Sequence, residues 1–276
     1  MKKKVASIGT LGIKTISGKT GVPNTTLDPI KMSYYLKKLK KQNIDNVILE
    51  ASSHGLKQNR LDGLNFKTAL FTNLSHDHLD YHKNFKNYLN AKLYLFKNLL
   101  NKKSNIITDM SIPEYKKIKK ISLKNKLNLK TIGSKKSDLN ITSHEYLGEK
   151  QIIKLKYKKK FYNFETKLIG KIQIKNLLMA ILAAEKSDIH FKNVLNVINK
   201  IKPVSGRLEK IGEVRNNSRV ILDYAHTPDA LQTSLESLKD QFKNSKISIV
   251  FGCGGDRDKF KRPRMGQIVN QFCNKI

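Results

Sequence analysis

Two stretches of this chain place acidic, imidazole and amide side chains where buried strands are expected to end. The apolar residues 47–49 lead directly into Glu50, and the apolar residues 69–71 lead to Asn73 and a cluster of His and Asp at positions 76–82. In open α/β sheets, ligands collect at the carboxyl ends of the strands. Two consecutive strands with such ends therefore predict a binding site at one edge of a sheet.

The cluster at positions 76–82 offers five potential metal ligands, which are His76, Asp77, His78, Asp80 and His82. His76 and His78 would share a face in a strand, but no second zinc-binding motif accompanies them. Glu50 at the neighbouring strand end favours a hard cation such as Mg²⁺, held by a carboxylate, one imidazole and water. A polar loop that binds no metal is the alternative.

The next stretch predicts an amphipathic helix that contains one anomalous residue. Its apolar side chains recur every three or four residues, at Phe85, Tyr88, Leu89, Phe96 and Leu99. Lys92 lies four residues from both Tyr88 and Phe96, so its Cβ points along the same inward stripe. An amine in that position must extend to solvent, pair with an anion, lose its charge or be modified. Extension to solvent is the structural alternative to a functional lysine.

The composition of this 276-residue chain argues against several classes of protein. No run of about 18 apolar residues occurs, so no transmembrane helix is expected, and the basic start lacks the apolar segment of a signal peptide. The two cysteines, Cys253 and Cys273, indicate a reducing cytosol without a disulfide framework. We therefore expect a cytoplasmic protein that does not bind membranes.

The formal net charge of +32 would fit a nucleic-acid-binding protein. The lysines are spread over the whole chain, however, together with abundant Asn and Ile, as the codons of an AT-rich genome would produce. The densest basic run, residues 154–160, alternates with apolar residues and predicts the solvated face of a strand. We expect anionic small substrates such as nucleotides, and no nucleic acid.

Hydrophobic periodicity predicts an α/β protein with two domains, residues 1–203 and 204–276, with the boundary marked by Pro203 and Gly206. In the first domain we expect strands at 4–9, 46–51, 69–71, 105–109 and 129–132, and antiparallel strands within 139–169. A loop with Gly18, Gly21 and Pro23 is expected after the first strand. Asp28 is expected to cap a helix from Pro29 to about Gln42, and further helices are expected near 85–99, 113–119, 174–186 and 190–200. In the second domain we expect a strand at 219–223, a helix at 228–242 and a strand at 246–251.

Two glycine-containing sequences have the composition of phosphate-binding loops. Residues 18–20 (GKT) lack the glycine that a P-loop needs five residues earlier, where Ile13 stands, so we reject that interpretation. Residues 252–255 (GCGG) would follow a buried strand, and their backbone N–H groups could approach an anion. An ordinary tight turn is the alternative. Asp223 and His226 follow the other strand of this domain, so both polar strand ends would share one edge.

Several motifs, in this order and spacing, resemble the Mur ligases and most closely the MurE type. They are EASSHGLKQNRLDG, FTNLSHDHLDYH, NYLNAKLYLF, SGRLE, LDYAHTPDAL and VFGCGGDRDKFKRPRMG. The resemblance covers almost the whole chain. It implies a central domain with a mostly parallel sheet and a small antiparallel part, followed by a Rossmann-like domain. It also implies ATP-dependent ligation of a diamino acid to UDP-MurNAc-L-Ala-D-Glu in peptidoglycan synthesis.

The resemblance implies roles for the residues that match family motifs. The UDP-muramyl dipeptide would be bound by Thr25, Thr26, Ser52, Gln58 and Arg60. Mg²⁺ would be bound by Glu50, His78 and Lys92, the last being carbamylated and so converted from a cation to an anionic ligand. ATP would be bound by Asn73, Asn176, Arg207, Asp223 and His226. Arg257 would contact the carboxylate of the incoming amino acid. Surface, cap and loop roles are the structural alternatives for Asn176, Asp223 and the two threonines.

The sequence also departs from the family pattern. It contains no GTNGKTT-type P-loop, no N-terminal domain for the uridine nucleotide and no DNPR-type motif for the diamino acid, and Gln173 replaces the first Asn of GxFNxxN. The similarity of GCGGDRDKFKRP to members that use meso-diaminopimelate favours that substrate, with lysine left open. A P-loop holds the ATP phosphates, so we expect a ligase truncated at both ends that is inactive by itself. It would be a fragment, a remnant or a split enzyme completed by a second chain. A non-catalytic domain that binds UDP-muramyl peptide or nucleotide is the alternative.

Overall fold

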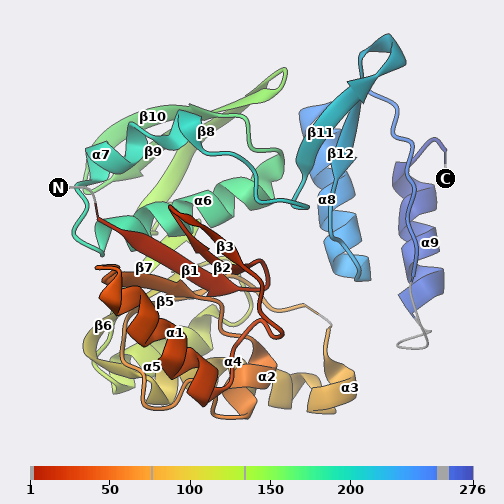
Figure 1. Ribbon diagram of the computed structural model, residues 1–276. Coiled ribbons are helices and arrows are strands. Elements are labelled where there is room, and N and C mark those ends of the chain that lie inside the picture. The colour runs from red at the N-terminus through yellow and green to blue at the C-terminus, as the bar shows by residue number, and fades with distance from the viewer. Residues whose placement is uncertain (1–2, 76, 134, 254–260, 276) are drawn as a thin grey trace. The chain divides into compact units, whose positions relative to one another are not determined.

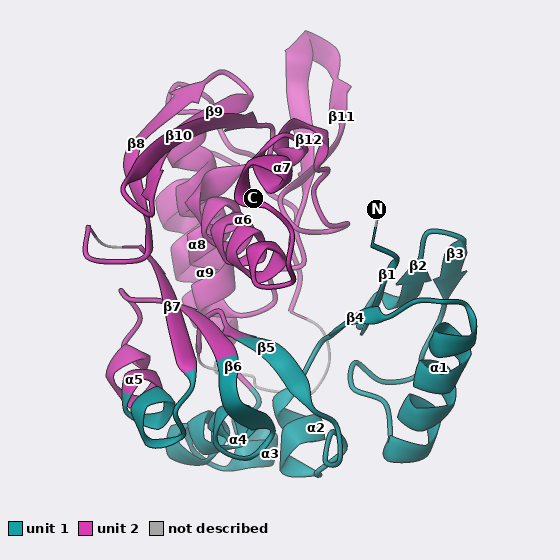
Figure 2. Cartoon of the chain, turned by 90° about the vertical axis from the view of Figure 1, so that its left-hand side faces the viewer, with its two compact units in different colours: residues 1–69, 78–104, 120–127 teal, residues 70–77, 105–119, 128–276 magenta. Residues whose placement is uncertain are grey.

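The computed structural model describes residues 3–75, 77–133, 135–253 and 261–275 (Figure 1). The chain forms two compact units, shown in teal and magenta in Figure 2. Unit 1 comprises residues 1–69, 78–104 and 120–127, and unit 2 comprises residues 70–77, 105–119 and 128–276. Each unit gathers segments that are distant in sequence. The predicted domain boundary after residue 203 stays a prediction.

Unit 1 contains a four-stranded sheet with the strand order β3-β2-β1-β4. Its strands are β1 (Val5–Gly9), β2 (Gly12–Thr15), β3 (Gly18–Thr20) and β4 (Asn46–Leu49). β1 pairs in parallel with β4 and antiparallel with β2, which pairs antiparallel with β3. The sequence pattern predicted β1 and β4 but assigned residues 12–20 to a loop, because β3 is exposed along its whole length and shows no apolar alternation.

The two long helices of unit 1 begin at residues that satisfy their free N–H groups. Unit 1 contains α1 (Pro29–Lys41), α2 (Ser53–Lys57), α3 (Leu79–His82) and α4 (Phe85–Asn98). The side chains of Asp28 and Asn84 accept hydrogen bonds from the backbone N–H groups of Lys31 and Asn87, each at 2.9 Å. These caps confirm the predicted starts of α1 and α4. Phe85 is 42% exposed, so the inward stripe of α4 begins only at Tyr88.

A second sheet has the strand order β10-β9-β8-β7-β6-β5. Its strands are β5 (Phe66–Phe71), β6 (Leu100–Asp109), β7 (Asn128–Gly133), β8 (Leu139–Leu147), β9 (Lys150–Tyr157) and β10 (Lys160–Thr166). Neighbouring strands from β6 to β8 are parallel, and those from β8 to β10 are antiparallel. The structure therefore confirms a mixed sheet whose antiparallel part lies within residues 139–169.

One expectation about this sheet is wrong. The strands that precede Glu50 and Asn73 were expected to be neighbours, but β4 belongs to the four-stranded sheet and β5 is the end strand of the six-stranded sheet. Strand pairing depends on contacts between segments that are distant in sequence. Two apolar runs that follow each other along the chain therefore do not establish that their strands pair.

The core of unit 2 forms where helix α6 packs on the mixed sheet. The helical elements here are α5 (Tyr115–Lys124), which both units share, α6 (Gly170–Glu185), α7 (Phe191–Leu195) and the short 3-10 helix η1 (Ile198–Lys200). The buried cluster includes Ile107, Ile132, Leu139, Ile153, Leu155, Leu178 and Leu182. The single helix predicted near 190–200 is thus broken into α7 and η1.

The last part of unit 2 is a hairpin followed by two helices. Its elements are β11 (Glu209–Val214), the 3-10 turn η2 (Arg215–Asn217), β12 (Ser218–Leu222), α8 (Pro228–Gln241) and α9 (Lys261–Phe272). The prediction of a strand at 246–251 is wrong, since only Ser248 forms a bridge there, with Lys275. A parallel strand is stable only with neighbours along its length. None of the described helices is long and apolar enough to cross a membrane.

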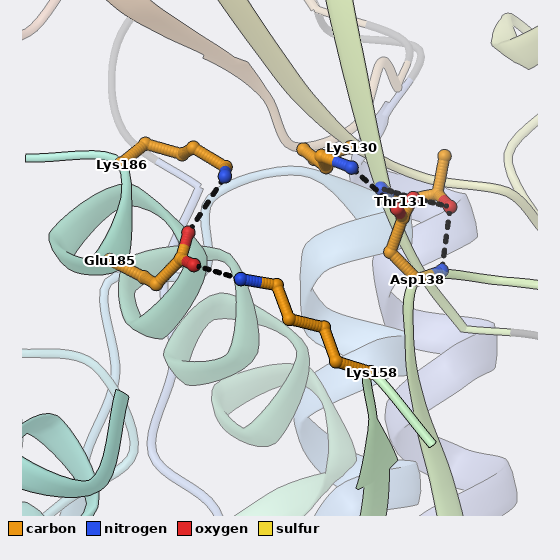
Figure 3. Close-up of polar contacts among 6 residues, drawn as sticks. All are labelled: Lys130, Thr131, Asp138, Lys158, Glu185 and Lys186. Carbon is orange, nitrogen blue, oxygen red and sulfur yellow. Dashed lines mark hydrogen bonds and ion pairs between the residues drawn. The ribbon is translucent and has the colours of Figure 1, made fainter. Parts of the chain in front are cut away.

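Two carboxylates of unit 2 are held by lysines (Figure 3). Asp138 accepts from Lys130 at 2.9 Å, and Glu185 lies 2.8 Å from Lys158 and 2.9 Å from Lys186. Burial acts to raise the pKa of Glu185, but the hydrogen bonds from Lys158 and Lys186 outweigh it and lower the pKa to about 2. Glu185 therefore stays ionised next to the core.

We expect Glu185 to stabilise the fold above its ordinary pKa of 4.5 and to lose this contribution as the pH falls towards about 2. In that range the unfolded chain binds a proton that the folded chain does not, so the free energy of unfolding decreases as the pH decreases. The pKa difference corresponds to about 3 kcal/mol. Urea unfolding should show this gap between wild type and Glu185→Gln near pH ~7, and roughly half of it near pH ~3.

The matched control is Glu165→Gln, which removes an exposed ion pair with Lys150. It should change the free energy of unfolding by less than about 0.5 kcal/mol at either pH. Equal losses in the two variants, or a Glu185→Gln gap that does not change with pH, would contradict the assignment of a low pKa to Glu185.

Candidate active site

A network of hydrogen bonds in unit 1 joins three stretches of sequence around the buried Thr26. Its Oγ1 donates to the Glu50 carbonyl oxygen at 2.8 Å and accepts from the Ser52 backbone N–H at 2.9 Å. The Arg60 guanidinium donates to the Thr26 carbonyl oxygen at 2.8 Å. The structure thus brings together three residues, Thr26, Ser52 and Arg60, that the sequence assigned to one substrate.

Glu50 follows β4 directly, and its side chain is exposed. Its Oε2 accepts from the Thr10 backbone N–H at 2.7 Å, and the Thr10 hydroxyl forms a 2.9 Å hydrogen bond with the Thr25 hydroxyl. A Cβ at Gly9 would lie 2.8 Å from the Glu50 Cβ, so only glycine fits beside this carboxylate. The carboxylate is therefore oriented by the backbone and remains open to a ligand.

Helix α2 uses some of the predicted substrate residues for its own structure. Ser52 caps the helix, since its Oγ accepts from the Gly55 N–H at 3.1 Å, and Gln58 donates to the Tyr81 hydroxyl at 3.0 Å. A Cβ at Gly55 would lie 2.6 Å from the Thr26 Cγ2, so α2 packs directly on Thr26. A serine hydroxyl that accepts in a cap can still donate, and Ser52 keeps that capacity.

Three histidine and two tyrosine rings pack together in unit 1. The His54 ring centroid lies 5.0 Å from that of His78 and 4.1 Å from that of Tyr81, and the His82 ring stacks on Tyr88 at 5.1 Å. Sequence reasoning missed His54, although it stands in the EASSHG motif, because nothing in the linear sequence connects it with residues 78–88. Only the fold brings α2 next to α4.

His82 is a buried member of this cluster. Its Nε2 lies 2.9 Å from the Ser53 hydroxyl. Burial, followed by the charges of His54 and His78, lowers the pKa of His82. A neutral, stacked and hydrogen-bonded imidazole is the usual state of a core histidine, and His82 fits that description better than it fits a metal ligand.

Lys92 and His78 lie against the same aromatic ring. Lys92 is half-buried, and its Nζ lies 5.4 Å from the centroid of the Tyr88 ring, while the His78 ring packs edge-on against Tyr88 at 5.9 Å. A cation over an aromatic face is favourable, so this contact can stabilise the Lys92 ammonium on the apolar side of α4. Two of the three expected metal ligands, His78 and Lys92, thus contact the same ring.

The donor set fits Mg²⁺ only if Lys92 is modified. An ammonium carries no lone pair and repels a cation, whereas a carbamate offers the oxygen ligands that Mg²⁺ prefers. Glu50 would add a carboxylate and His78 an imidazole. Within the described part of the chain, no three His, Cys, Asp or Glu side chains form a cluster suited to a metal. Metal binding by Glu50, His78 and Lys92 therefore depends on the carbamate.

In unit 2, Asp223 organises the loop that carries Arg207. Asp223 Oδ2 accepts from the Leu208 N–H at 2.8 Å, and its Oδ1 accepts from the Ala225 N–H at 2.9 Å. The Arg207 guanidinium lies over the Tyr224 ring, 5.4 Å from its centroid. Asp223 thus joins the SGRLE motif to the DYAHTP motif, which agrees with the structural alternative of a turn-capping aspartate.

The other predicted nucleotide residues differ in their surroundings. His226 Nε2 lies 3.5 Å from Asp77 Oδ2, and the hydrogen bond to Asp77 raises the pKa of His226 despite its partial burial. Asn73 and Asn176 are exposed, so their amides are accessible to a ligand. Arg257 lies outside the described residues, as does His76.

Gln173 stands where the family pattern has Asn, and its side chain has a defined partner. Its Nε2 donates to the Arg207 carbonyl oxygen at 2.9 Å. Gln173 belongs to α6, and Arg207 lies in the segment that leads into β11. Hydrogen bonds of the Arg207–Leu208 segment therefore join Gln173 and Asp223 into one group of unit 2. The Gln173 side chain, which is longer than the Asn of the family pattern, forms one of these bonds.

Comparison with known protein families gives two matches. Residues 1–184 match the Mur ligase middle domain, and residues 206–276 match the Mur ligase glutamate ligase domain. The resemblance seen in the sequence motifs is thereby confirmed, as is the expected fold class, a mixed-sheet α/β domain followed by a second domain.

Two curated relatives and one solved structure illustrate the match. The UDP-N-acetylmuramoyl-L-alanyl-D-glutamate–2,6-diaminopimelate ligase of Rickettsia conorii is 41% identical over 99% of this chain and 57% of the relative. The ligase of the same name from Agrobacterium fabrum is 35% identical over 98% of this chain and 55% of the relative. A solved structure of a ligase of that name has a TM-score of 0.78 and 32% identity, covering 99% of this chain and 55% of its own.

The chain therefore spans little more than half the length of the relatives that it matches. Its middle-domain match alone extends over 184 of the 276 residues. Because that match covers well over half of the sequence, the chain belongs to the Mur ligase family.

Proposed function

We propose that this chain is the central and C-terminal part of a MurE-type ligase, which adds meso-diaminopimelate to UDP-MurNAc-L-Ala-D-Glu at the expense of ATP. The observation that carries the proposal is the convergence of Thr26, Ser52 and Arg60 around the end of β4, because the segment with Thr26 and the EASSHGLKQNRLDG motif form one hydrogen-bonded network there. The names of the relatives support the substrates.

The proposed reaction explains why the site would need positively charged groups and also the ordered carboxylate of Glu50. A carboxylate is a poor electrophile until one of its oxygens becomes a leaving group. Transfer of the ATP γ-phosphoryl group to the dipeptide carboxylate gives an acyl phosphate and releases ADP. The amine of the diamino acid then attacks the carbonyl carbon, and inorganic phosphate leaves. Bound Mg²⁺ would offset the negative charge that accumulates during phosphoryl transfer.

The residues of unit 1 would bind the muramyl substrate and the metal. Arg60 orients Thr26 by donating to the Thr26 carbonyl oxygen, and the Thr10 N–H fixes the exposed side chain of Glu50. The substrate residue Thr26 and the metal ligand Glu50 would therefore be in position before a substrate arrives. The proposed substrate residues are Thr25, Thr26, Ser52, Gln58 and Arg60. The proposed metal ligands are Glu50, His78 and carbamylated Lys92.

The residues of unit 2 would bind ATP. The Arg207 guanidinium lies over the Tyr224 ring, and the Arg207 backbone carbonyl accepts a hydrogen bond from Gln173. Arg207 is therefore a pre-organised cation, and such cations stabilise phosphoryl transfer. The proposed ATP residues are Asn73, Asn176, Arg207, Asp223 and His226. Arg257 is proposed to contact the carboxylate of the incoming amino acid. The domain division at residues 203/204 and a cytoplasmic location belong to the same proposal.

Ligation by the purified chain tests the proposal. The chain would be assayed alone, and also after fusion to the segments of the Rickettsia conorii relative that lie outside the match, here called the fused ligase. Each would receive Mg-ATP, UDP-MurNAc-L-Ala-D-Glu and meso-diaminopimelate, and ADP and the tripeptide product would be measured. We expect turnover by the fused ligase, with lysine as a poorer substrate.

The possible results separate the two functions considered for this sequence. Turnover by the fused ligase supports the ligase. Binding of the UDP-muramyl dipeptide without turnover in either form supports a binding domain. Absence of both binding and turnover in a folded protein would contradict the proposal.

A further inference from the structure

A buried carboxylate, Asp109, lies at the end of β6 and has no role in the chemistry above. Its side chain is 1% exposed, and its Oδ2 lies 2.7 Å from the Lys175 Nζ. Its Oδ1 accepts from both the N–H and the hydroxyl of Ser111, each at 2.7 Å. Burial acts to raise the pKa of Asp109, but the hydrogen bonds from Lys175 and Ser111 outweigh it and lower the pKa. Asp109 is therefore an anion inside the protein.

The strands around Asp109 fix its position. Asp109 stands opposite Ile132 in the parallel register of β6 and β7, and Gly133 follows with a φ of +112°. A Cβ on Gly133 would overlap the Asp109 Oδ1, so the β7 backbone closes directly over the carboxylate. The carboxyl ends of parallel strands are where ligands of α/β proteins bind. The anion is thus built into the edge of the sheet where a nucleotide would be expected.

Lys175 belongs to helix α6, so its ion pair with Asp109 attaches this helix to the end of β6. It directly precedes Asn176, a proposed ATP residue, and it stands two residues after Gln173, which donates to the Arg207 carbonyl at 2.9 Å. One turn of α6 therefore connects the buried Asp109 with both Asn176 and Arg207. The ion pair leaves Lys175 44% exposed, so the turn lies at the surface while its anchor is buried.

We infer that Asp109 and Lys175 are positioning residues of the nucleotide site, which lock the turn of α6 that carries Gln173 and Asn176 against the ends of β6 and β7. This inference rests on the proposed ATP-dependent function. An ion pair with a fully buried partner is little screened by solvent, and removal of one partner leaves an uncompensated charge. Such a pair holds a helix turn more rigidly than an exposed pair does.

The same helix provides a matched control. Lys171 forms a 2.7 Å ion pair with Asp240, but the two side chains are 61% and 45% exposed. It lies one turn before Lys175 and has the same type of partner. Lys171→Met therefore removes a lysine and an ion pair from α6 without disturbing a buried anchor.

The test is the dissociation constant of Mg-ATP for the fused ligase, which contains a P-loop, measured by calorimetry beside that of UDP-MurNAc-L-Ala-D-Glu. Asp109→Asn and Lys175→Met should each weaken ATP binding by about tenfold, as loss of supporting residues commonly does. The dissociation constant of the UDP-muramyl dipeptide should stay within about twofold, and Lys175→Arg should keep ATP affinity because it retains the pair. Lys171→Met should bind ATP like wild type.

Three outcomes would count against the inference. A folded Asp109→Asn variant with a lower Tm but unchanged ATP affinity would show that the pair is only structural and overturn it. An equal loss in Lys171→Met would overturn it as well, because the effect would then come from any charge on α6. A wild-type fused ligase that binds no ATP would contradict the proposed ATP site itself, and with it this inference.

Discussion

Replacement of Lys92 with Met should reduce ligation by the fused ligase by about 10²–10³-fold, the loss typical for one electrostatic group of a catalytic site. Lys92 is half-buried over Tyr88 in α4, between the buried residues Leu89 and Phe96. Met keeps the length and apolar stem of the side chain, so the packing of α4 should survive. It cannot form a carbamate, so the metal would lose an anionic ligand.

Two measurements distinguish this loss from a general defect. ADP release should fall in Lys92→Met but not in Lys97→Met, which removes an exposed lysine from the last turn of the same helix. With ¹³C-labelled bicarbonate, the NMR spectrum of the wild-type chain should show a carbamate signal that Lys92→Met lacks. Full activity in Lys92→Met, or a carbamate signal that persists in it, would remove Lys92 from the proposed metal site.

Truncation of Phe96 to Ala should lower the free energy of unfolding by about 3–5 kcal/mol. Phe96 is 1% exposed and is among the largest fully buried side chains of the chain. Its removal takes a full aromatic ring out of a buried position in α4. The cost combines the lost transfer free energy with that of the cavity left behind. Urea unfolding followed by circular dichroism would measure it.

Phe161→Ala is the control for this prediction. Phe161 is 70% exposed in β10, and the Lys156 ammonium lies 5.5 Å from the centroid of its ring. The change should cost less than about 1 kcal/mol, the worth of an exposed cation–π contact. Similar losses in the two variants would mean that Phe96 is not the core residue that its burial indicates.

Local sequence signals predicted the starts of two helices, α1 and α8. Asp28 with Pro29 predicted the start of α1, and the Asp28 carboxylate does accept from the Lys31 N–H. The helix predicted from 228 is α8, where the Thr227 hydroxyl accepts from the Ala230 N–H at 3.3 Å. Caps and amphipathic periodicity act within a few residues, so they can be read without knowledge of the fold.

The partners of the strands could not be read in the same way. Residues 46–49 form a strand as predicted, but its neighbour is β1 and not β5. Residues 246–251 have the apolar pattern of a strand but form only one bridge. A strand is stabilised by hydrogen bonds to segments distant in sequence, so its pattern specifies a type of element without specifying its neighbours.

The site shows the same division. The sequence by itself determined which residues belong to family motifs, the inward position of Lys92 and the start of α1 at Pro29. Only the tertiary structure decided that Thr26 joins Ser52 and Arg60, that His54 packs beside His78, and that the buried Asp109 holds Lys175. The physical reason is that a residue type and its local periodicity are properties of neighbouring positions, whereas hydrogen bonds and ion pairs between distant segments exist only once the chain has folded.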